Sequence, residues 1–292
     1  MSDVSRITVI GAGTMGRGIA QVAGAAGYDV SLHDVSEELV REAIESIRTT
    51  LENGISRGKG SSQARDAVLS RIHPAPRLED AAASSELVIE AVPESLDLKR
   101  EVFRRAGASA PASAVLATNT SALPVAEIAR AAPRPEAVVG MHFFNPVHLM
   151  PLLEVVRAER TSAEAVDCAL AVGRRMGKEP IVVRDSPGFA TSRLGVVIGL
   201  EAMRMLEQGV ASAEDIDRAM TLGYRHPMGP LRLSDLVGLD VRLAIAEHLY
   251  RSLGSEAFRP PEILRRLVAQ GRLGKKTGQG FHRWDAAAQG GE

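Results

Sequence analysis

Short apolar runs alternate with segments of helical periodicity over most of the chain. The apolar runs are typical of buried parallel strands and lie at residues 7–10, 29–33, 72–74, 87–92, 115–118, 138–141, 152–156 and 181–183. Apolar residues at helical spacing predict helices between them, most clearly over residues 37–53, 96–108 and 163–176. This alternation predicts an α/β fold, a doubly wound and mostly parallel Rossmann-type sheet.

The pattern changes after the Asp-Ser-Pro-Gly sequence that ends at Gly188. From there only helical periodicity is found, at residues 189–208, 213–222, 231–237, 240–253 and 261–270. We therefore expect a dinucleotide-binding domain over residues 1–184, an all-helical substrate and dimerisation domain over 185–285, and a flexible tail over 286–292.

The first apolar run leads into a G-x-G-x-x-G loop with glycines at Gly11, Gly13 and Gly16. The first glycine allows a tight turn, the second lets a pyrophosphate approach the backbone, and the third lets the next helix pack closely on the sheet. Thr14 and Met15 begin that helix, whose free N–H groups would face the phosphates. The loop therefore predicts a dinucleotide site.

Asp34 strengthens this prediction because it ends the second apolar run, at the distance where an acid accepts hydrogen bonds from an adenosine ribose. A carboxylate there would repel a 2′-phosphate, so the expected cofactor is NAD and not NADP. The alternative is that Asp34 caps the next helix, a role for which Ser36 competes.

Composition narrows the class of protein. Lys and Arg number 35 against 36 Asp and Glu, a net charge of −1, so neither nucleic acid nor a membrane surface is an expected partner. Cys168 is the one cysteine, which favours a reducing cytoplasm and argues against a cysteine-bound metal. No run is apolar and long enough to span a bilayer, and no signal peptide or metal site is expected.

Ligands of open α/β sheets bind at the carboxyl ends of the strands, where polar residues follow apolar runs at Glu94, Asn119, Ser121, His142 and Asn145. Glu154 lies inside the next apolar run and needs a buried partner. We expect that partner to be His142, with the imidazole as general base and the carboxylate orienting it. Taken alone, His142 would more often be a hydrogen-bonded core histidine, and it is Glu154 in the next apolar run that favours the catalytic role.

Several blocks in order resemble the NAD-dependent L-3-hydroxyacyl-CoA dehydrogenases, especially the 3-hydroxybutyryl-CoA dehydrogenase branch. The resemblance extends from Ile7 to Trp284. The blocks are G-A-G-T-M-G at 11–16, E-A-V-P-E at 90–94 with Lys99, T-N-T-S at 118–121, G-M-H-F-F-N-P at 140–146, D-S-P-G-F at 185–189, H-P-M-G-P at 226–230 with Asp235 and G-L-D at 238–240, and G-K-K-T-G-Q-G-F at 274–281.

The resemblance implies a role for each matching residue. His142 would be the base, Glu154 its partner, and Ser121 and Asn145 would hold the substrate. The other implied contacts are Glu94, Lys99 and Asn119 with the nicotinamide half of NAD, and Arg57 and Lys59 with the CoA tail. From charge alone, Arg57 and Lys59 could as well belong to a solvated turn. The family also implies a homodimer joined through the helical domain.

One position departs from the family pattern. Ser192 stands where the family usually has an asparagine that contacts substrate and nicotinamide. Serine is shorter, and it can donate or accept one hydrogen bond. The sequence therefore does not fix which acyl group is bound, or whether the substrate is a CoA ester. The predicted fold is unaffected.

The expected function is reversible oxidation of a short-chain L-3-hydroxyacyl-CoA, such as 3-hydroxybutyryl-CoA, with NAD. One alternative is the same scaffold acting on a free hydroxy acid or another secondary alcohol. A second is an NAD(H)-binding protein without turnover. A relative of the 6-phosphogluconate dehydrogenases would need a lysine base in the first long helix of the second domain, and residues 189–208 contain no lysine.

Overall fold

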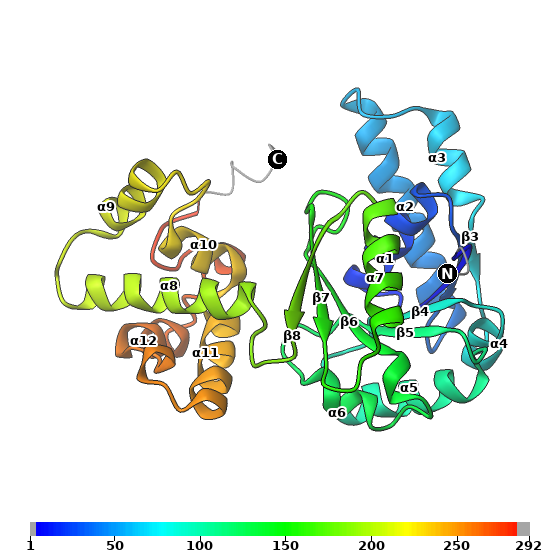
Figure 1. The fold of residues 1–292 in the computed structure, drawn as a ribbon. Helices are drawn as coiled ribbons and strands as arrows, with labels where there is room; N and C mark the ends of the chain where they lie inside the picture. Colours follow the sequence, from blue (N-terminus) through cyan, green and yellow to red (C-terminus); the bar gives the residue numbers. More distant parts are fainter. Residues whose placement is uncertain (1–3, 285–292) are drawn as a thin grey trace. The chain divides into compact units, whose positions relative to one another are not determined.

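The computed structural model describes residues 4–284, which form two compact units, residues 4–186 and residues 187–284 (Figure 1). The flexible tail expected at residues 286–292 lies outside the described residues. The first unit contains, in chain order, β1 (Arg6–Ile10), α1 (Thr14–Ala25), β2 (Asp29–His33), α2 (Glu37–Ser56), α3 (Ser62–Leu69), β3 (Ile72–Pro74), α4 (Leu78–Ala83), β4 (Leu87–Glu90), α5 (Leu96–Ser109), β5 (Val115–Thr118), α6 (Val125–Ala129), β6 (Val138–Phe143), β7 (Leu152–Arg157), α7 (Ala163–Arg175) and β8 (Glu179–Arg184).

The sheet of the first unit has eight strands in the order β3-β2-β1-β4-β5-β6-β7-β8. All neighbours pair in parallel except β6 and β7, which are antiparallel. The expected alternation of strand and helix therefore fails at one point, because the link from β6 to β7 is too short for a helical crossover. The strand order reverses between β1 and β4, so the carboxyl ends of these strands form the crevice where ligands of such sheets bind.

Hydrophobic residues on one face of this sheet pack against α1, α2 and α7. Ile7 and Val9 of β1 are fully buried there, together with Ile19 of α1 and Ile47 of α2. Each such side chain stabilises the fold by about 1.5–3 kcal/mol. This core holds the strand ends rigid where the polar residues begin.

The helices α2 and α3 form a hairpin, and Figure 1 shows them side by side. Ser36 caps α2 by accepting a hydrogen bond from the N–H of Leu39. The competing assignment of this cap to Asp34 is therefore wrong, which leaves the Asp34 carboxylate available for other contacts.

The second unit is helical and contains α8 (Thr191–Glu207), α9 (Ala213–Arg218), a π-helical turn (Ala219–Gly223), α10 (Pro230–Val237), α11 (Leu239–Leu253) and α12 (Glu262–Ala269). The sequence predicts that α8 begins at Phe189, but it begins at Thr191. Gly188 and Phe189 have φ of 75° and 48°, which no α-helical residue adopts, so the turn displaces the helix start. No helix in residues 4–284 is long and apolar enough to cross a membrane.

Two buried aspartates attach the C-terminal segment to the helical unit. Asp235 accepts hydrogen bonds from the backbone N–H groups of Phe281 and His282, at 2.9 and 2.8 Å. Asp217 accepts one at 2.8 Å from Nε2 of His282. The bond to Asp217 raises the pKa of His282 against the opposing effect of its partial burial.

This raised pKa predicts how stability depends on pH. Protonation of His282 stabilises the folded chain fully below the pKa of an unfolded histidine, about 6.5, and the contribution is lost as the pH rises through the higher folded pKa. Wild type should therefore exceed His282→Gln in free energy of unfolding by more at pH 5.5 than at pH 8.5. Denaturant titrations at both values test this, and an equal difference at both would contradict it.

Candidate functional site

The glycine loop between β1 and α1 has the geometry that the sequence predicts. Gly11 has φ of 102°, and a Cβ there would lie 2.6 Å from the carbonyl oxygen of Ala91. A Cβ on Gly16 would overlap the carbonyl oxygen of Gly11. At Gly13, by contrast, no atom of the described chain lies within 4 Å of an added Cβ. Gly11 and Gly16 therefore serve the fold, and Gly13 leaves space beside the backbone.

Asp34 lies at the carboxyl end of β2, beside this loop. Its Oδ2 accepts a 2.6 Å hydrogen bond from the N–H of Ala12, and its Oδ1 accepts one from the N–H of Val35. The carboxylate thus stabilises the loop that begins α1. No side chain caps α1 at Gly13. The free N–H groups of the first turn, which begins with Thr14 and Met15, are therefore available to a ligand in the open space.

A buried ion pair lies at the end of β4. The ammonium of Lys99 is 2.7 Å from Oε1 of Glu90, and both side chains are 1% exposed. Glu90 also accepts hydrogen bonds from Oγ1 of Thr118 and the N–H of Val92, each at 2.7 Å. Burial raises the pKa of Glu90 despite these partners. Lys99 is thus enclosed by protein acceptors, and it reaches toward a ligand only through the carboxylates that it binds.

Glu94 connects this pair to the loop after β5. Its Oε2 lies 3.3 Å from the Lys99 ammonium, and its Oε1 accepts hydrogen bonds from Oγ1 of Thr120 at 2.5 Å and from the N–H of Ser121 at 3.0 Å. Burial alone would raise the pKa of Glu94, but the bonds from Thr120, Lys99 and Ser121 hold it below its usual value. Glu94 is therefore an ionised, partly exposed carboxylate that orders the backbone at Ser121.

The expected pair of His142 and Glu154 is present. The two residues face each other in the antiparallel register of β6 and β7, and Nδ1 of His142 lies 2.7 Å from Oε2 of Glu154. Glu154 is fully buried, and His142 is 6% exposed, with its ring 4.4 Å from that of Phe144. A bond to a carboxylate fixes the proton on Nδ1, which makes Nε2 the basic nitrogen.

Asn119 and Asn145 follow the ends of β5 and β6. Asn119, after β5, accepts a 2.9 Å hydrogen bond at Oδ1 from the N–H of Phe143 and so connects the ends of β5 and β6. Asn145 is exposed and lines a polar hollow of about 160 Å³ between α1, α2 and the loop after β6. The other polar residues of this hollow are Thr14, Arg17, Gln21, Ser46, Thr50 and His148.

The remaining candidates belong to other segments of the chain. Arg57 and Lys59 are exposed in the turn that joins α2 to α3. Ser192 is half-buried in the first turn of α8, within the helical unit. Their expected contacts with substrate remain predictions.

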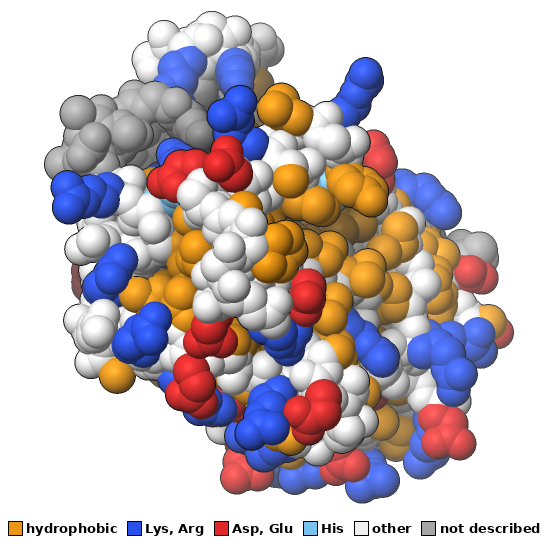
Figure 2. Space-filling view, turned by 90° about the vertical axis from the view of Figure 1, so that its left-hand side faces the viewer, with side chains coloured by type: hydrophobic (Ala, Val, Ile, Leu, Met, Phe, Trp, Pro, Cys, Tyr) orange, Lys and Arg blue, Asp and Glu red, His pale blue; other side chains and the backbone are white. Residues whose placement is uncertain are grey.

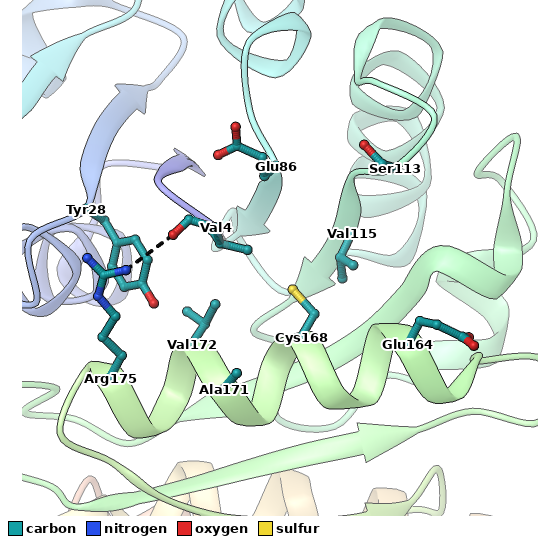
Figure 3. Close-up of a pocket in the computed structure, with 10 residues that line it drawn as sticks. All are labelled: Val4, Tyr28, Glu86, Ser113, Val115, Glu164, Cys168, Ala171, Val172 and Arg175. Atoms are coloured by element: carbon teal, nitrogen blue, oxygen red, sulfur yellow. Dashed lines mark hydrogen bonds between the residues drawn. The ribbon is translucent and has the colours of Figure 1, made fainter. Parts of the chain in front are cut away.

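A larger cavity, of about 430 Å³, lies at the opposite edge of the sheet, where the strands begin (Figure 3). Val4, Tyr28 and Glu86 precede β1, β2 and β4 there, and the guanidinium of Arg175 from α7 stacks 4.3 Å from the Tyr28 ring. Cys168 also faces this cavity, and burial raises the pKa of its thiol to about 11. The thiol is therefore protonated at neutral pH and is not a nucleophile.

The sequence analysis missed Glu90, Thr118 and Thr120 as parts of the site. A signal for Glu90 was available, because it closes an apolar strand just as Glu154 lies within one. No signal in the sequence indicated the polar hollow beside Asn145, because that hollow combines residues from three segments far apart in the chain.

The residues present fit a dinucleotide. The open space at Gly13 admits a phosphate, the start of α1 supplies N–H donors, and Asp34 supplies an acceptor for a ribose. Among residues 4–284, no group of three or more His, Cys, Asp or Glu side chains could hold a metal ion.

Comparisons with known proteins match the chain along its length. The sequence model described as "3-hydroxyacyl-CoA dehydrogenase, NAD binding domain" matches residues 6–186, and that of the "C-terminal domain" matches residues 188–284. A probable 3-hydroxybutyryl-CoA dehydrogenase from Bacillus subtilis is 41% identical over 283 residues, covering 97% of this chain and 98% of that protein. A 3-hydroxyadipyl-CoA dehydrogenase from Escherichia coli is 39% identical, covering 98% and 60%. The crystal structure of an (S)-3-hydroxybutyryl-CoA dehydrogenase from Ralstonia eutropha has a TM-score of 0.93 at 36% identity, covering 97% and 100%.

Proposed function

Because the chain belongs to the 3-hydroxyacyl-CoA dehydrogenase family and is an NAD-dependent dehydrogenase, we propose that it interconverts a short-chain L-3-hydroxyacyl-CoA and the 3-oxoacyl-CoA. The substrate would be 3-hydroxybutyryl-CoA or a close analogue. The observation that carries this proposal is the buried bond between His142 and Glu154 at the carboxyl end of β6.

His142 acts as the general base of this reaction. Its Nε2 takes the proton of the substrate hydroxyl, and the Glu154 carboxylate stabilises the imidazolium that forms. In the reverse direction the same nitrogen returns the proton to the carbonyl oxygen. The bound NAD would supply the hydride acceptor for the carbon that carries the hydroxyl.

The reactants are oriented around His142 by four polar residues, Ser121, Asn145, Glu94 and Asn119. Ser121 donates a hydrogen bond to the substrate oxygen, and Glu94 supports it by ordering its backbone N–H. Asn145 holds the substrate from the loop after β6. Glu94 faces the nicotinamide ribose with Asn119, whereas Lys99, which is 1% exposed, acts by charging and positioning Glu94. Gly11, Gly13, Gly16 and Asp34 hold the adenosine half of NAD.

The CoA tail lies along α2. The polar hollow beside Asn145 and the exposed cations Arg57 and Lys59 are the features that support this placement. The phosphates of such a tail are anionic, and exposed cationic side chains can reach them.

The proposed assembly is a cytoplasmic homodimer joined through the helical unit. That unit exposes many large hydrophobic side chains, which a second copy of the chain would bury in a dimer. Figure 2 shows hydrophobic side chains gathered on one face of the molecule between charged ones. The exposed hydrophobic residues of the unit are Leu194, Ile198, Val210, Leu222, Tyr224, Leu233, Leu236, Val237 and Val241.

A second candidate function is oxidation of a free hydroxy acid. Ser192 favours it, because this serine replaces an asparagine that contacts the substrate in the family. A substrate panel separates the two functions. NADH consumption should be rapid with acetoacetyl-CoA and slower by at least about 100-fold with free acetoacetate, while NADPH should support little turnover because of Asp34. Equal rates with the free acid and the thioester would overturn the proposal.

A further inference from the structure

Gln21 is a buried side chain whose amide is left without a partner. It lies on the buried side of α1 and is 7% exposed. The amide makes no hydrogen bond with any group of residues 4–284, and the side chain lines the polar hollow beside Asn145. A primary amide carries two N–H donors and one acceptor oxygen. Leaving them unpaired in a buried position is costly, so this amide is suited to pair with a ligand that enters the hollow.

Two helices direct polar groups into this hollow. Thr14, Arg17 and Gln21 recur on α1 at helical spacing, so they share one face of that helix. Ser46 and Thr50 of α2 line the opposite wall, one turn apart. Thr50 donates its hydroxyl to the carbonyl oxygen of Ser46, which leaves the Thr50 oxygen as an acceptor. The hollow therefore offers both donors and acceptors from facing helices.

The third wall, the loop after β6, is held in place from two sides. The ammonium of Lys178, a residue that is 7% exposed, donates hydrogen bonds to the carbonyl oxygens of Val147 and Met150. Val147 in turn packs on α1, since a Cβ on Gly18 would lie 2.8 Å from its Cγ2. The loop is thus fixed against α1, and the hollow is preformed for a ligand.

The hollow is mainly neutral. Burial and the nearby ammonium of Lys178 lower the pKa of His148, so this imidazole is uncharged at neutral pH. Among the described residues that line the hollow, none is acidic, and the half-buried Arg17 is the one with a fixed charge. A phosphate carries acceptors alone and is usually met by several charged donors. An amide, which needs a donor and an acceptor together, matches these walls better.

Asn145 connects the hollow to the substrate, because the proposed function assigns it to substrate binding and it also lines the hollow. In an acyl-CoA, the thioester continues into the pantetheine arm, whose first amide follows after two methylene groups. The hollow, of about 160 Å³, is smaller than the pockets of about 300–1,000 Å³ that enclose whole ligands. It therefore suits a segment of this arm and not a nucleotide.

We infer that the polar hollow beside Asn145 binds an amide of the pantetheine arm and that Gln21 is the residue that recognises it. This inference rests on the proposed function and deepens it. Gln21 is then a specificity-determining residue, which favours pantetheine thioesters over simple thioesters and free acids. The proton transfer at His142 is unchanged.

Two uncharged substrates test this with the full chain and NADH. Acetoacetyl-pantetheine carries the amides, whereas S-butyl acetothioacetate is a thioester without an amide, and neither carries a phosphate. Wild type should favour the pantetheine ester in kcat/KM by at least about tenfold. Gln21→Met, which retains the length of the side chain, should reduce this preference by about tenfold, mainly through KM. Gln270→Met, which changes an exposed glutamine after α12, should leave the preference intact.

Two further measurements separate ligand binding from other roles of Gln21. Gln21→Met should melt at or above the wild-type temperature, because it removes an unpaired buried amide, and its KM for NADH should be unchanged.

A wild-type preference of one or less, an equal effect of Gln21→Met on both thioesters, or a fall in melting temperature of more than about 4 °C would each overturn the inference. A raised KM for NADH with an unchanged preference would also do so, since the hollow would then serve the cofactor. A defect with acetoacetyl-CoA that is absent with acetoacetyl-pantetheine would show that the hollow binds a phosphate instead. If wild type reduces no thioester, acetoacetyl-CoA included, the proposed function itself fails.

Discussion

Replacing His142 by alanine should lower kcat for reduction of acetoacetyl-CoA by about 10²–10⁴, the usual contribution of one positioned general acid or base. The loss should appear in kcat more than in the affinity for NADH, because the glycine loop and Asp34 lie on other strands. Stopped-flow turnover together with NADH fluorescence titration measures both quantities.

Two variants control for this result. His73→Ala removes an exposed histidine of β3 and should leave kcat unchanged. Glu154→Gln retains a hydrogen-bond acceptor for Nδ1 but removes the charge that stabilises the imidazolium, so kcat should fall by at least about tenfold. Retention of kcat within about threefold in His142→Ala would show that another group moves the proton.

The second large effect is expected at Gly16, where a Cβ would overlap the carbonyl oxygen of Gly11. Because the opposing atom belongs to the backbone and cannot rotate away, Gly16→Ala must displace the loop or α1, at a cost of about 3 kcal/mol or more. The melting temperature should fall by about 6 °C or more, and NADH binding should fall with it.

Gly13→Ala is the matched control because no described atom opposes a Cβ at that position. This variant should melt within about 1 °C of wild type and yet bind NADH at least about tenfold more weakly, since the methyl group occupies the space where a phosphate approaches the backbone. Equal loss of stability in both variants would show that the open space at Gly13 belongs to the fold and not to a ligand.

Local rules were sufficient for the glycine loop and the strand ends. Each function of Gly11, Gly13 and Gly16 depends on the absence of one Cβ in a strand–turn–helix segment, which the sequence displays directly. The pairing of His142 with Glu154 was also predictable, because a carboxylate in an apolar strand requires a partner and the next strand offers one.

Local rules failed where atoms from distant segments compete for the same group. The resemblance assigned Lys99 to a ribose, but the ammonium is enclosed by Glu90, Glu94 and the carbonyl oxygen of Val92. The start of α8 was misplaced because periodicity does not report the positive φ of Phe189. Neither feature alters the apolar pattern from which helices and strands are predicted.

By itself the sequence determined the kind of fold, the dinucleotide loop and the pairing of His142 with Glu154, because these depend on residue type and on spacing along one or two elements. The tertiary structure decided which nitrogen of His142 faces Glu154, and that Lys99 is buried against Glu90. Those are properties of several segments brought within a few ångströms of each other. Only the packing of the whole chain specifies which polar atoms end with a partner and which do not.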